Sequence, residues 1–176
     1  MLSLLLARAG IPVTLLEHHK DFDRDFRGDT IHSSTLELLE QIGLSDRLHQ
    51  LPHTKTRELD IVSPAGTYPI ALFKRLPTPF PYIMMMPQSR FLDFLANEVR
   101  KYPHFRLIMG ASADELIEED SAVRGVRYHT SEGSGEIRAT LTIGCDGRFS
   151  RLRKCAGLEP VSQSAPMEVL WFRLPR

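Results

Sequence analysis

The sequence has few cysteines, no excess of either charge and no long apolar run. Its two cysteines, Cys145 and Cys155, are too few for a disulfide framework and favour a reducing, cytoplasmic setting. Lysine plus arginine and aspartate plus glutamate number 22 each, so the basic surface of a nucleic-acid-binding protein is not expected. No stretch approaches the roughly 18 apolar residues of a membrane span. The seven histidines are scattered rather than spaced as metal ligands.

A glycine-rich phosphate loop is also missing. Residues 1–9 are predicted to form a helix that ends at Gly10, and residues 13–16 a short, fully buried strand that ends in Glu17. In a Rossmann unit, an acid at the end of the second strand binds the ribose hydroxyls of a nucleotide. The strand and the G-x-G-x-x-G turn that would precede this helix are absent. Glu17 is therefore either a ribose-binding acid, which the helix–glycine–strand–acid order favours, or an ordinary exposed acid.

The most informative stretch runs from residue 139 to residue 153. Residues 139–143 favour a strand, Gly144, Asp146 and Gly147 follow, and an arginine-rich helical pattern comes next. The two glycines allow a tight turn and the close approach of a ligand to the main chain. Asp146 would then lie at the carboxyl end of a strand, and the helix after it would offer free backbone N–H groups to a phosphate. A plain strand-to-helix turn without a ligand is the alternative.

The remaining pattern predicts an α/β protein. Helices are expected over residues 35–41, 45–50 and 87–102, and strands over residues 58–63, 67–72, 83–86, 105–109, 113–117, 122–130, 135–143 and 167–172. The clearest helix begins at Pro87, with an apolar stripe along one face. Gln88 lies in its first turn, where it is either a ligand-binding group or a polar surface residue.

Four segments, in this order, resemble the flavoprotein aromatic hydroxylases, the FAD-dependent monooxygenases similar to para-hydroxybenzoate hydroxylase. They are residues 8–17, residues 26–32, residues 86–88, and the run Gly144-Cys145-Asp146-Gly147 with Ser150 and Arg153. The resemblance extends over nearly the whole chain. It implies an internal fragment of such an enzyme, without the N-terminal glycine fingerprint and without the C-terminal half.

The resemblance implies an FAD site built from several segments. Glu17 matches the ribose-binding acid, Arg27 with Gly28 matches the loop at the flavin nucleotide, and Gln88 matches a glutamine that contacts FAD. Glu17, Arg27, Gln88 and Asp146 are therefore expected to converge on one cleft.

The Asp-Gly motif adds the remaining residues. Asp146 with Gly147 matches a motif that serves FAD and, in some members, NAD(P)H; Arg153 matches a position for the pyridine nucleotide, with a surface arginine as the favoured alternative. FAD, reduced by NAD(P)H, would react with oxygen and hydroxylate a small aromatic substrate. Because the cofactor carries this chemistry, no catalytic protein residue and no metal is expected.

The fold class expected is α/β: an incomplete Rossmann-like FAD-binding domain with a β meander and part of a substrate-side β-sheet. Residues 1–52 and 86–157 would form the FAD-binding part, and residues 53–85 and 158–176 the substrate-side part. Because the central strand of the parallel sheet is missing, an unpaired edge and self-association are expected.

Three hypotheses follow for the function. The first is a flavin monooxygenase. The second is a non-catalytic remnant of one, with weak or no FAD binding. The third is an NAD(P) dehydrogenase, which ranks last because both the glycine fingerprint and a catalytic constellation are lacking.

Overall fold

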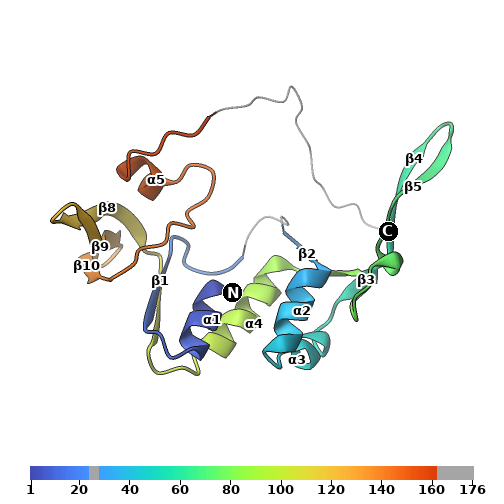
Figure 1. Ribbon diagram of the computed structural model, residues 1–176, viewed down its shortest axis with the longest axis horizontal. Helices are drawn as coiled ribbons and strands as arrows, with labels where there is room; N and C mark the ends of the chain where they lie inside the picture. The colour runs from blue at the N-terminus through green and yellow to red at the C-terminus, as the bar shows by residue number, and fades with distance from the viewer. Residues whose placement is uncertain (24–27, 162–176) are drawn as a thin grey trace. The chain divides into compact units, whose positions relative to one another are not determined.

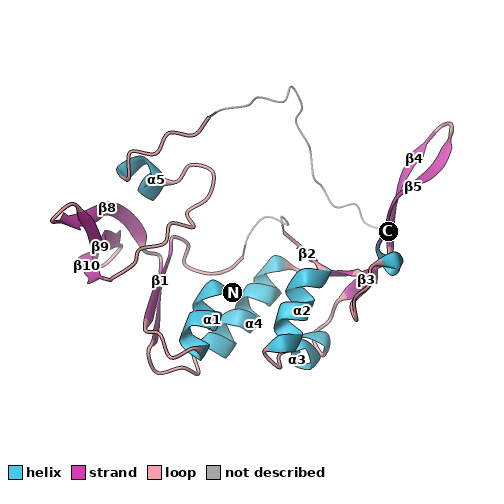
Figure 2. Ribbon diagram, viewed as in Figure 1, coloured by secondary structure: helices cyan, strands magenta, loops and turns pink. Residues whose placement is uncertain are grey.

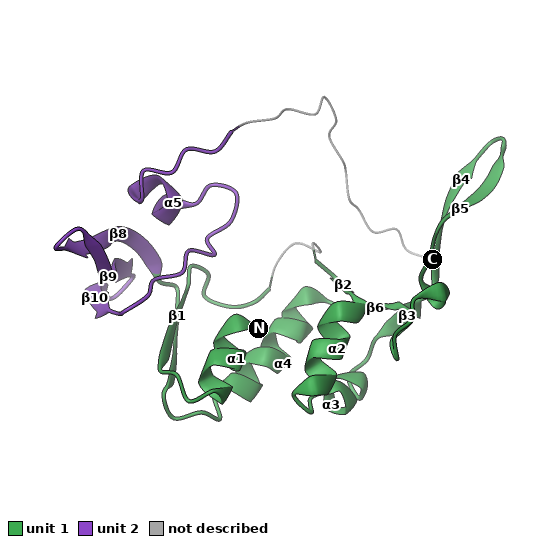
Figure 3. Cartoon of the chain, in the orientation of Figure 1, with its two compact units in different colours: residues 1–111 green, residues 112–176 purple. Residues whose placement is uncertain are grey.

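The structure is a computed structural model with a mixed α/β fold, described over residues 1–23 and 28–161. Figure 1 traces its helices and strands along the chain. The chain forms two compact units, residues 1–111 and residues 112–176 (Figure 3). The domain boundaries expected from the sequence stay a prediction.

Unit 1 combines helices with small sheets. Its helices are α1 (Leu2–Arg8), α2 (Ser33–Gln41), α3 (Ser45–His49), η1 (Phe73–Arg75) and α4 (Gln88–Val99). Its strands are β1 (Val13–Glu17), β2 (Thr30–Ile31), β3 (Thr54–Thr56), β4 (Glu58–Ser63), β5 (Gly66–Leu72), β6 (Ile83–Met85) and β7 (Phe105–Met109). Strand β1 pairs in parallel with β7, β6 lies between β2 and β3, and β4 pairs with β5. Helix α1 packs on α4, and α2 on α3 (Figure 1).

The core of unit 1 lies where these helices meet β6. Leu36 and Leu39 of α2 and Met84 of β6 are fully buried. Of the apolar stripe that the sequence predicts for α4, Phe94, Leu95 and Val99 are buried and the first turn is half-buried. The buried cluster comprises Leu4, Ala7, Ile31, Leu36, Leu39, Leu44, Leu48, Tyr82, Met84, Met86, Phe94, Leu95 and Val99. This packing fixes the start of α4 beside β2 and β6.

A buried acid joins α4 to α3. The Glu98 side chain is only 7% exposed and accepts hydrogen bonds from Arg47 and, at 2.7 Å, from Lys101. Burial alone would raise the pKa of the Glu98 carboxyl, but the bonds from Lys101 and Arg47 outweigh it and hold that pKa below its ordinary value of 4.5.

Strand β1 is less buried than its apolar sequence predicts. Leu15 is 38% exposed, so the expectation of a fully buried strand is wrong. The reason is the pairing: among the described residues, β1 has a partner only in β7, with Val13 opposite Phe105 and Glu17 opposite Met109.

The predicted hairpin over residues 58–63 and 67–72 is confirmed as β4 and β5. It extends away from the helices of unit 1 (Figure 2) and leaves Ile61, Tyr68 and Ile70 about half exposed. The strand pairing shifts register between Leu59 and Asp60. The predicted strand over residues 167–172, assigned to the same substrate-side sheet, lies outside the described residues.

Unit 2 contains the predicted β meander. Strands β8 (Ser112–Glu119), β9 (Ala122–Thr130) and β10 (Gly133–Arg138) form a sheet in the order β10-β9-β8. The turn between β8 and β9 is made by Asp120 and Ser121, both at positive φ (51° and 60°). This is the backbone of a type I′ turn, which suits the twist of a two-residue hairpin.

The last predicted strand of the meander is too long. Strand β10 ends at Arg138, and Ala139 donates one further bond to the Arg124 carbonyl. Residues 139–147 form no strand, although Ala139 to Ile143 have strong β propensity. A strand needs a neighbouring strand to bond its backbone N–H and C=O groups. Beyond the bond of Ala139, no described strand pairs with this segment, and Leu141 is left 72% exposed.

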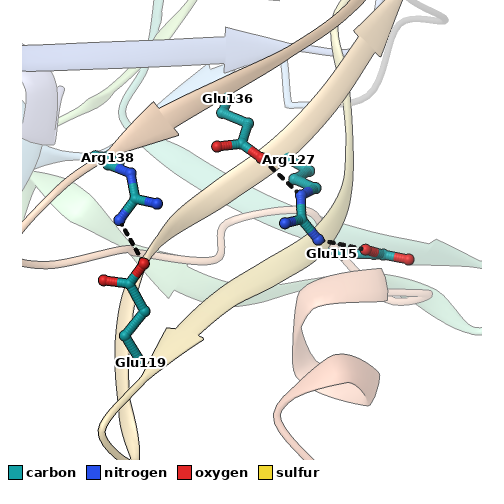
Figure 4. Close-up of polar contacts among 5 residues, drawn as sticks. All are labelled: Glu115, Glu119, Arg127, Glu136 and Arg138. Carbon is teal, nitrogen blue, oxygen red and sulfur yellow. Dashed lines mark hydrogen bonds and ion pairs between the residues drawn. The ribbon is translucent and has the colours of Figure 1, made fainter.

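Charged side chains cover one face of the meander. Arg127 on the middle strand donates to Glu136 on β10 at 2.8 Å and to Glu115 on β8 at 3.3 Å, while Arg138 binds Glu119 at 2.7 Å (Figure 4). These pairs link all the strands of the meander sheet, but they are exposed and contribute little free energy.

The short helix of unit 2, α5 (Arg151–Cys155), is held against β8 by one acid. The Asp114 carboxylate binds Arg151 and, at 2.6 Å, His129, while the Asp114 carbonyl accepts from the Cys155 thiol. The loop that contains Asp146 is thereby anchored to the meander at its far end.

Candidate cofactor site

Glu17 is the last residue of β1, as the sequence predicts. Its side chain is 28% exposed, and Oε1 lies 2.9 Å from both the backbone nitrogen and Nδ1 of His19. Its carbonyl accepts from Ala111, directly after β7. Glu17 therefore shapes the turn after β1 and leaves its carboxylate partly open to solvent at the carboxyl end of the two parallel strands.

Gly28 and Gln88 lie against each other although they are far apart in the sequence. Gly28 has a φ of +78°, and a Cβ placed there would lie 2.7 Å from Nε2 of Gln88. A side chain there would strain the backbone and would require the Gln88 amide to move. Gly28 and Gln88, both expected from the sequence in the cofactor site, therefore lie side by side, and the positive φ favours glycine at position 28.

Asp29 completes this part of the site, and the sequence reasoning missed it. Its Oδ1 accepts a hydrogen bond of 3.0 Å from the backbone N–H of Gln88, and its carbonyl accepts from Met86 at 2.9 Å. An acid after a glycine in a polar loop is a weak signal for a helix cap. The signal is weaker still when the helix begins 59 residues later.

In unit 2 the Asp-Gly motif is a self-supporting turn. The Asp146 carboxylate accepts from the Ser150 hydroxyl and from the Leu152 backbone N–H at 3.0 Å, and Ser150 Oγ accepts from the Arg153 N–H at 3.0 Å. Partial burial alone would raise the pKa of Asp146, but the bonds from Ser150 and from the Leu152 backbone hold it below its ordinary value of 3.8.

These caps correct two expectations about the motif. Asp146 does not follow a strand, because residues 139–147 form none. The backbone N–H groups of Leu152 and Arg153 are already bonded to Asp146 and Ser150, so they are not free donors for a phosphate. The helix itself is too short, at 5 residues, to act as a phosphate-binding helix.

Asp146, Gly147 and Arg153 nevertheless line one hollow of about 570 Å³, together with apolar side chains such as Leu116 and Leu152. Gly147 has a φ of +79° and open space where a Cβ would stand. The Arg153 guanidinium donates to the Arg148 carbonyl at 2.8 Å. A hollow that is lined by the acid Asp146, by Arg153 and by apolar side chains can bind a ligand that is polar at one end.

The structure thus joins some of the predicted site residues and leaves others untested. Gly28 meets Gln88 in unit 1, and Asp146, Gly147 and Arg153 meet in unit 2. Arg27 lies outside the described residues. The convergence of Glu17, Arg27, Gln88 and Asp146 on one cleft therefore stays a prediction.

The donor set suits an organic cofactor with hydroxyl and amide groups. The Glu17 carboxylate at the end of β1 can accept hydrogen bonds from the hydroxyl groups of such a ligand. The Gln88 side-chain amide beside Gly28 can both donate and accept them. Within residues 1–23 and 28–161, no group of three or more His, Cys, Asp or Glu could hold a metal ion. In the same residues, no helix is long and apolar enough to cross a membrane.

Comparison with known proteins agrees with this donor set. The chain belongs to the FAD binding domain family, whose pattern matches residues 1–174. This confirms the resemblance to the FAD-dependent monooxygenases and the Rossmann-like α/β class that the sequence predicts.

Particular relatives are monooxygenases. The chain is 30% identical over 175 residues to 6-methylpretetramide 4-monooxygenase of Streptomyces rimosus, covering 98% of this chain and 42% of that protein. It is 29% identical over 157 residues to squalene epoxidase 4 of Arabidopsis thaliana, covering 87% and 30%. The solved structure of OxyS anhydrotetracycline hydroxylase from Streptomyces rimosus superposes with a TM-score of 0.76 at 27% identity, covering 93% and 32%. The chain spans less than half the length of each.

Proposed function

We propose that the chain provides the FAD-binding part of an NAD(P)H-dependent flavin monooxygenase that hydroxylates an aromatic substrate. The observation that carries the proposal is the family match along residues 1–174. The names of two relatives, a 6-methylpretetramide 4-monooxygenase and an anhydrotetracycline hydroxylase, support the reaction and the substrate class.

The chain's own residues would bind and orient the cofactor. Bound FAD supplies the redox chemistry, and the protein supplies position and polarity. Glu17 would accept hydrogen bonds from ribose hydroxyls, and Gln88 would present its amide over the Gly28 main chain. Arg27 would face the flavin nucleotide, as its match to the family implies.

The Asp-Gly loop would supply the second part of the site. Asp146 and Gly147 would face FAD, and Arg153 would serve the pyridine nucleotide NAD(P)H. The hollow that these residues line supports this assignment. Because the Asp146 carboxylate is held ionised by Ser150 and Leu152, it would accept hydrogen bonds from ligand hydroxyls over the whole neutral pH range.

A titration with FAD tests the binding proposal. We expect Glu17→Ala and Gln88→Ala each to raise the FAD dissociation constant roughly tenfold, the effect of losing one hydrogen bond of about 1.4 kcal/mol. Asp93→Ala is the matched control, because Asp93 is an exposed residue of the same helix, α4. Equal FAD affinity of Gln88→Ala and the wild type would contradict the site.

The reaction is tested by oxygen incorporation. With FAD present, NADH and NADPH are compared as reductants while a panel of phenols and polycyclic phenols is offered. Stimulated oxidation of one reductant, with one oxygen atom added to the substrate, supports the proposal. Oxidation that no aromatic compound stimulates argues against it.

Self-association and a cytoplasmic location complete the proposal. The Val13 N–H donates to the His104 carbonyl, on the side of β1 that faces β7. Because successive residues of a strand point their N–H groups to opposite sides, the Thr14 N–H faces the outer edge of β1. No described strand covers that edge, which supports pairing with another copy. Thr14→Pro removes the outward N–H without removing a β1–β7 bond, so it should reduce the apparent mass in size-exclusion chromatography if the edge mediates association.

A further inference from the structure

We infer that Asp29 is a positioning residue for Gln88. The inference rests on the proposed function, because it takes the Gln88 amide as a cofactor contact. It adds a residue that the family resemblance does not assign.

Asp29 accepts hydrogen bonds from the residues on both sides of Pro87. Its carbonyl accepts from the Met86 N–H at 2.9 Å, and its carboxylate accepts from the Gln88 N–H at 3.0 Å. Pro87 between them has no N–H to offer. These bonds continue the pairing of β2 with β6, in which Thr30 lies opposite Met85. The start of α4 is therefore fixed to the loop that contains Gly28 by a short run of bonds.

This arrangement leaves the side-chain amide of Gln88 as the group available to a ligand. Its backbone N–H is already bonded to Asp29. The structure gives the side-chain amide no hydrogen bond to any described residue, yet the amide lies closely over Gly28. An amide offers two donors and a two-fold acceptor, and its position depends on a backbone that Asp29 holds.

The test combines hydrogen exchange with ligand titration on the full chain. In Asp29→Ala we expect the Gln88 backbone N–H to exchange at least tenfold faster, and in Asp29→Asn much less so, because the asparagine carbonyl still accepts. FAD and riboflavin are titrated into the wild type, Asp29→Ala, Asp29→Asn, Gln88→Ala and the double variant. Asp93→Ala on the same helix is the control for loss of an acidic side chain.

Positioning predicts a coupled result. Asp29→Ala and Gln88→Ala should each weaken FAD and riboflavin binding about tenfold, and the double variant should bind no more weakly than Gln88→Ala alone. Additive losses would overturn the positioning role.

Failure of the proposed function gives a different pattern. If Gln88→Ala binds FAD as tightly as the wild type does, Gln88 is not a cofactor contact, and the positioning role of Asp29 is overturned as well. If Gln88→Ala weakens binding and Asp29→Ala does not, only the inference about Asp29 falls. Exchange protection of core amides in α2 reports whether Asp29→Ala is folded. If it is not, Asp29→Asn is the test instead: it should keep the protection of the Gln88 amide and the FAD affinity close to those of the wild type, and a loss of FAD affinity as large as that of Gln88→Ala would overturn the positioning role.

Discussion

Asp29 and Asp146 both bind a backbone N–H at the start of a helix, but they reach it over very different distances along the chain. Asp29 accepts from Gln88, 59 residues later, whereas Asp146 accepts from Leu152, 6 residues later. The first contact exists only when the core of unit 1 has assembled. The second is a local turn that Ser150 reinforces.

The difference separates two ways of building a ligand site. The Gly28–Gln88 part depends on tertiary packing, so a distant core substitution should disturb it. The Asp-Gly turn depends on neighbouring residues, so it should persist as long as unit 2 is folded. Substitutions in each unit test this contrast.

The largest effect is expected from the core of unit 1. Leu36→Ala should lower the free energy of unfolding by about 2–5 kcal/mol, because Leu36 is fully buried and its loss leaves a cavity. Urea unfolding measures this, and Leu59→Ala in the exposed hairpin is the control. The backbone N–H of Gln88 should lose protection from exchange, while that of Leu152 keeps it. An equal loss at both would show that the Gly28–Gln88 part and the Asp-Gly turn do not differ in their dependence on the core of unit 1.

A smaller effect is expected from the buried acid of unit 1. Glu98→Gln should lower the free energy of unfolding by about 1–3 kcal/mol at pH 7, through weakened charged hydrogen bonds to Arg47 and Lys101. Because the folded pKa of Glu98 lies below its ordinary value, its contribution is complete above the unfolded pKa and is lost as pH falls through the folded pKa.

Unfolding curves at a series of pH values measure this loss. The wild type should lose stability below about pH 4.5 more steeply than Glu98→Gln. Glu40→Gln, at an exposed position of α2, should follow the wild type. Parallel curves for all three proteins would show that Glu98 does not carry the acid sensitivity.

The local turn of unit 2 should respond less. Ser150→Ala removes the side-chain cap of α5 and should cost about 0.5–2 kcal/mol of helix stability. Exchange of the Arg153 amide should accelerate, while the Gln88 amide is unaffected. Ser131→Ala, in an exposed turn of the same unit, serves as the control. A change at Gln88 would mean that the two loops are coupled.

The smallest effect is expected from the ion pairs of the meander. Glu119→Gln removes the negative charge opposite Arg138 (Figure 4), and the urea midpoint should shift slightly at low salt and not at all in high salt. A shift that survives high salt would give this pair a larger structural role than its exposure suggests.

Local patterns in the sequence predicted much of the fold. The meander β8–β10, the strand β7, the hairpin β4–β5 and the helix α4 all follow from periodicity and turn residues close to them in the chain. The expectations that were wrong concern strands whose pairing or burial depends on a neighbouring strand from elsewhere in the chain. Residues 139–143 have strand propensity but no described neighbour, and Leu15 is exposed for the same reason.

The candidate site shows the same limit. The resemblance assigns Gly28, Gln88 and Asp146 to one cofactor site, and this assignment stays a prediction. It did not identify Asp29, whose partner is distant in sequence, nor the capping that occupies the first N–H groups of α5. Both depend on hydrogen-bond geometry that composition and spacing do not contain.

The parallel pairing of β1 with β7 also sets an order of folding. Val13 lies opposite Phe105, so this sheet cannot close until a long stretch of chain has been synthesised and its loop-closure entropy has been overcome. The meander has strands that follow one another directly, and contacts of such low order form quickly. We therefore expect unit 2 to gain protection from exchange within milliseconds of refolding and β1 to gain it last, the opposite of their order along the chain.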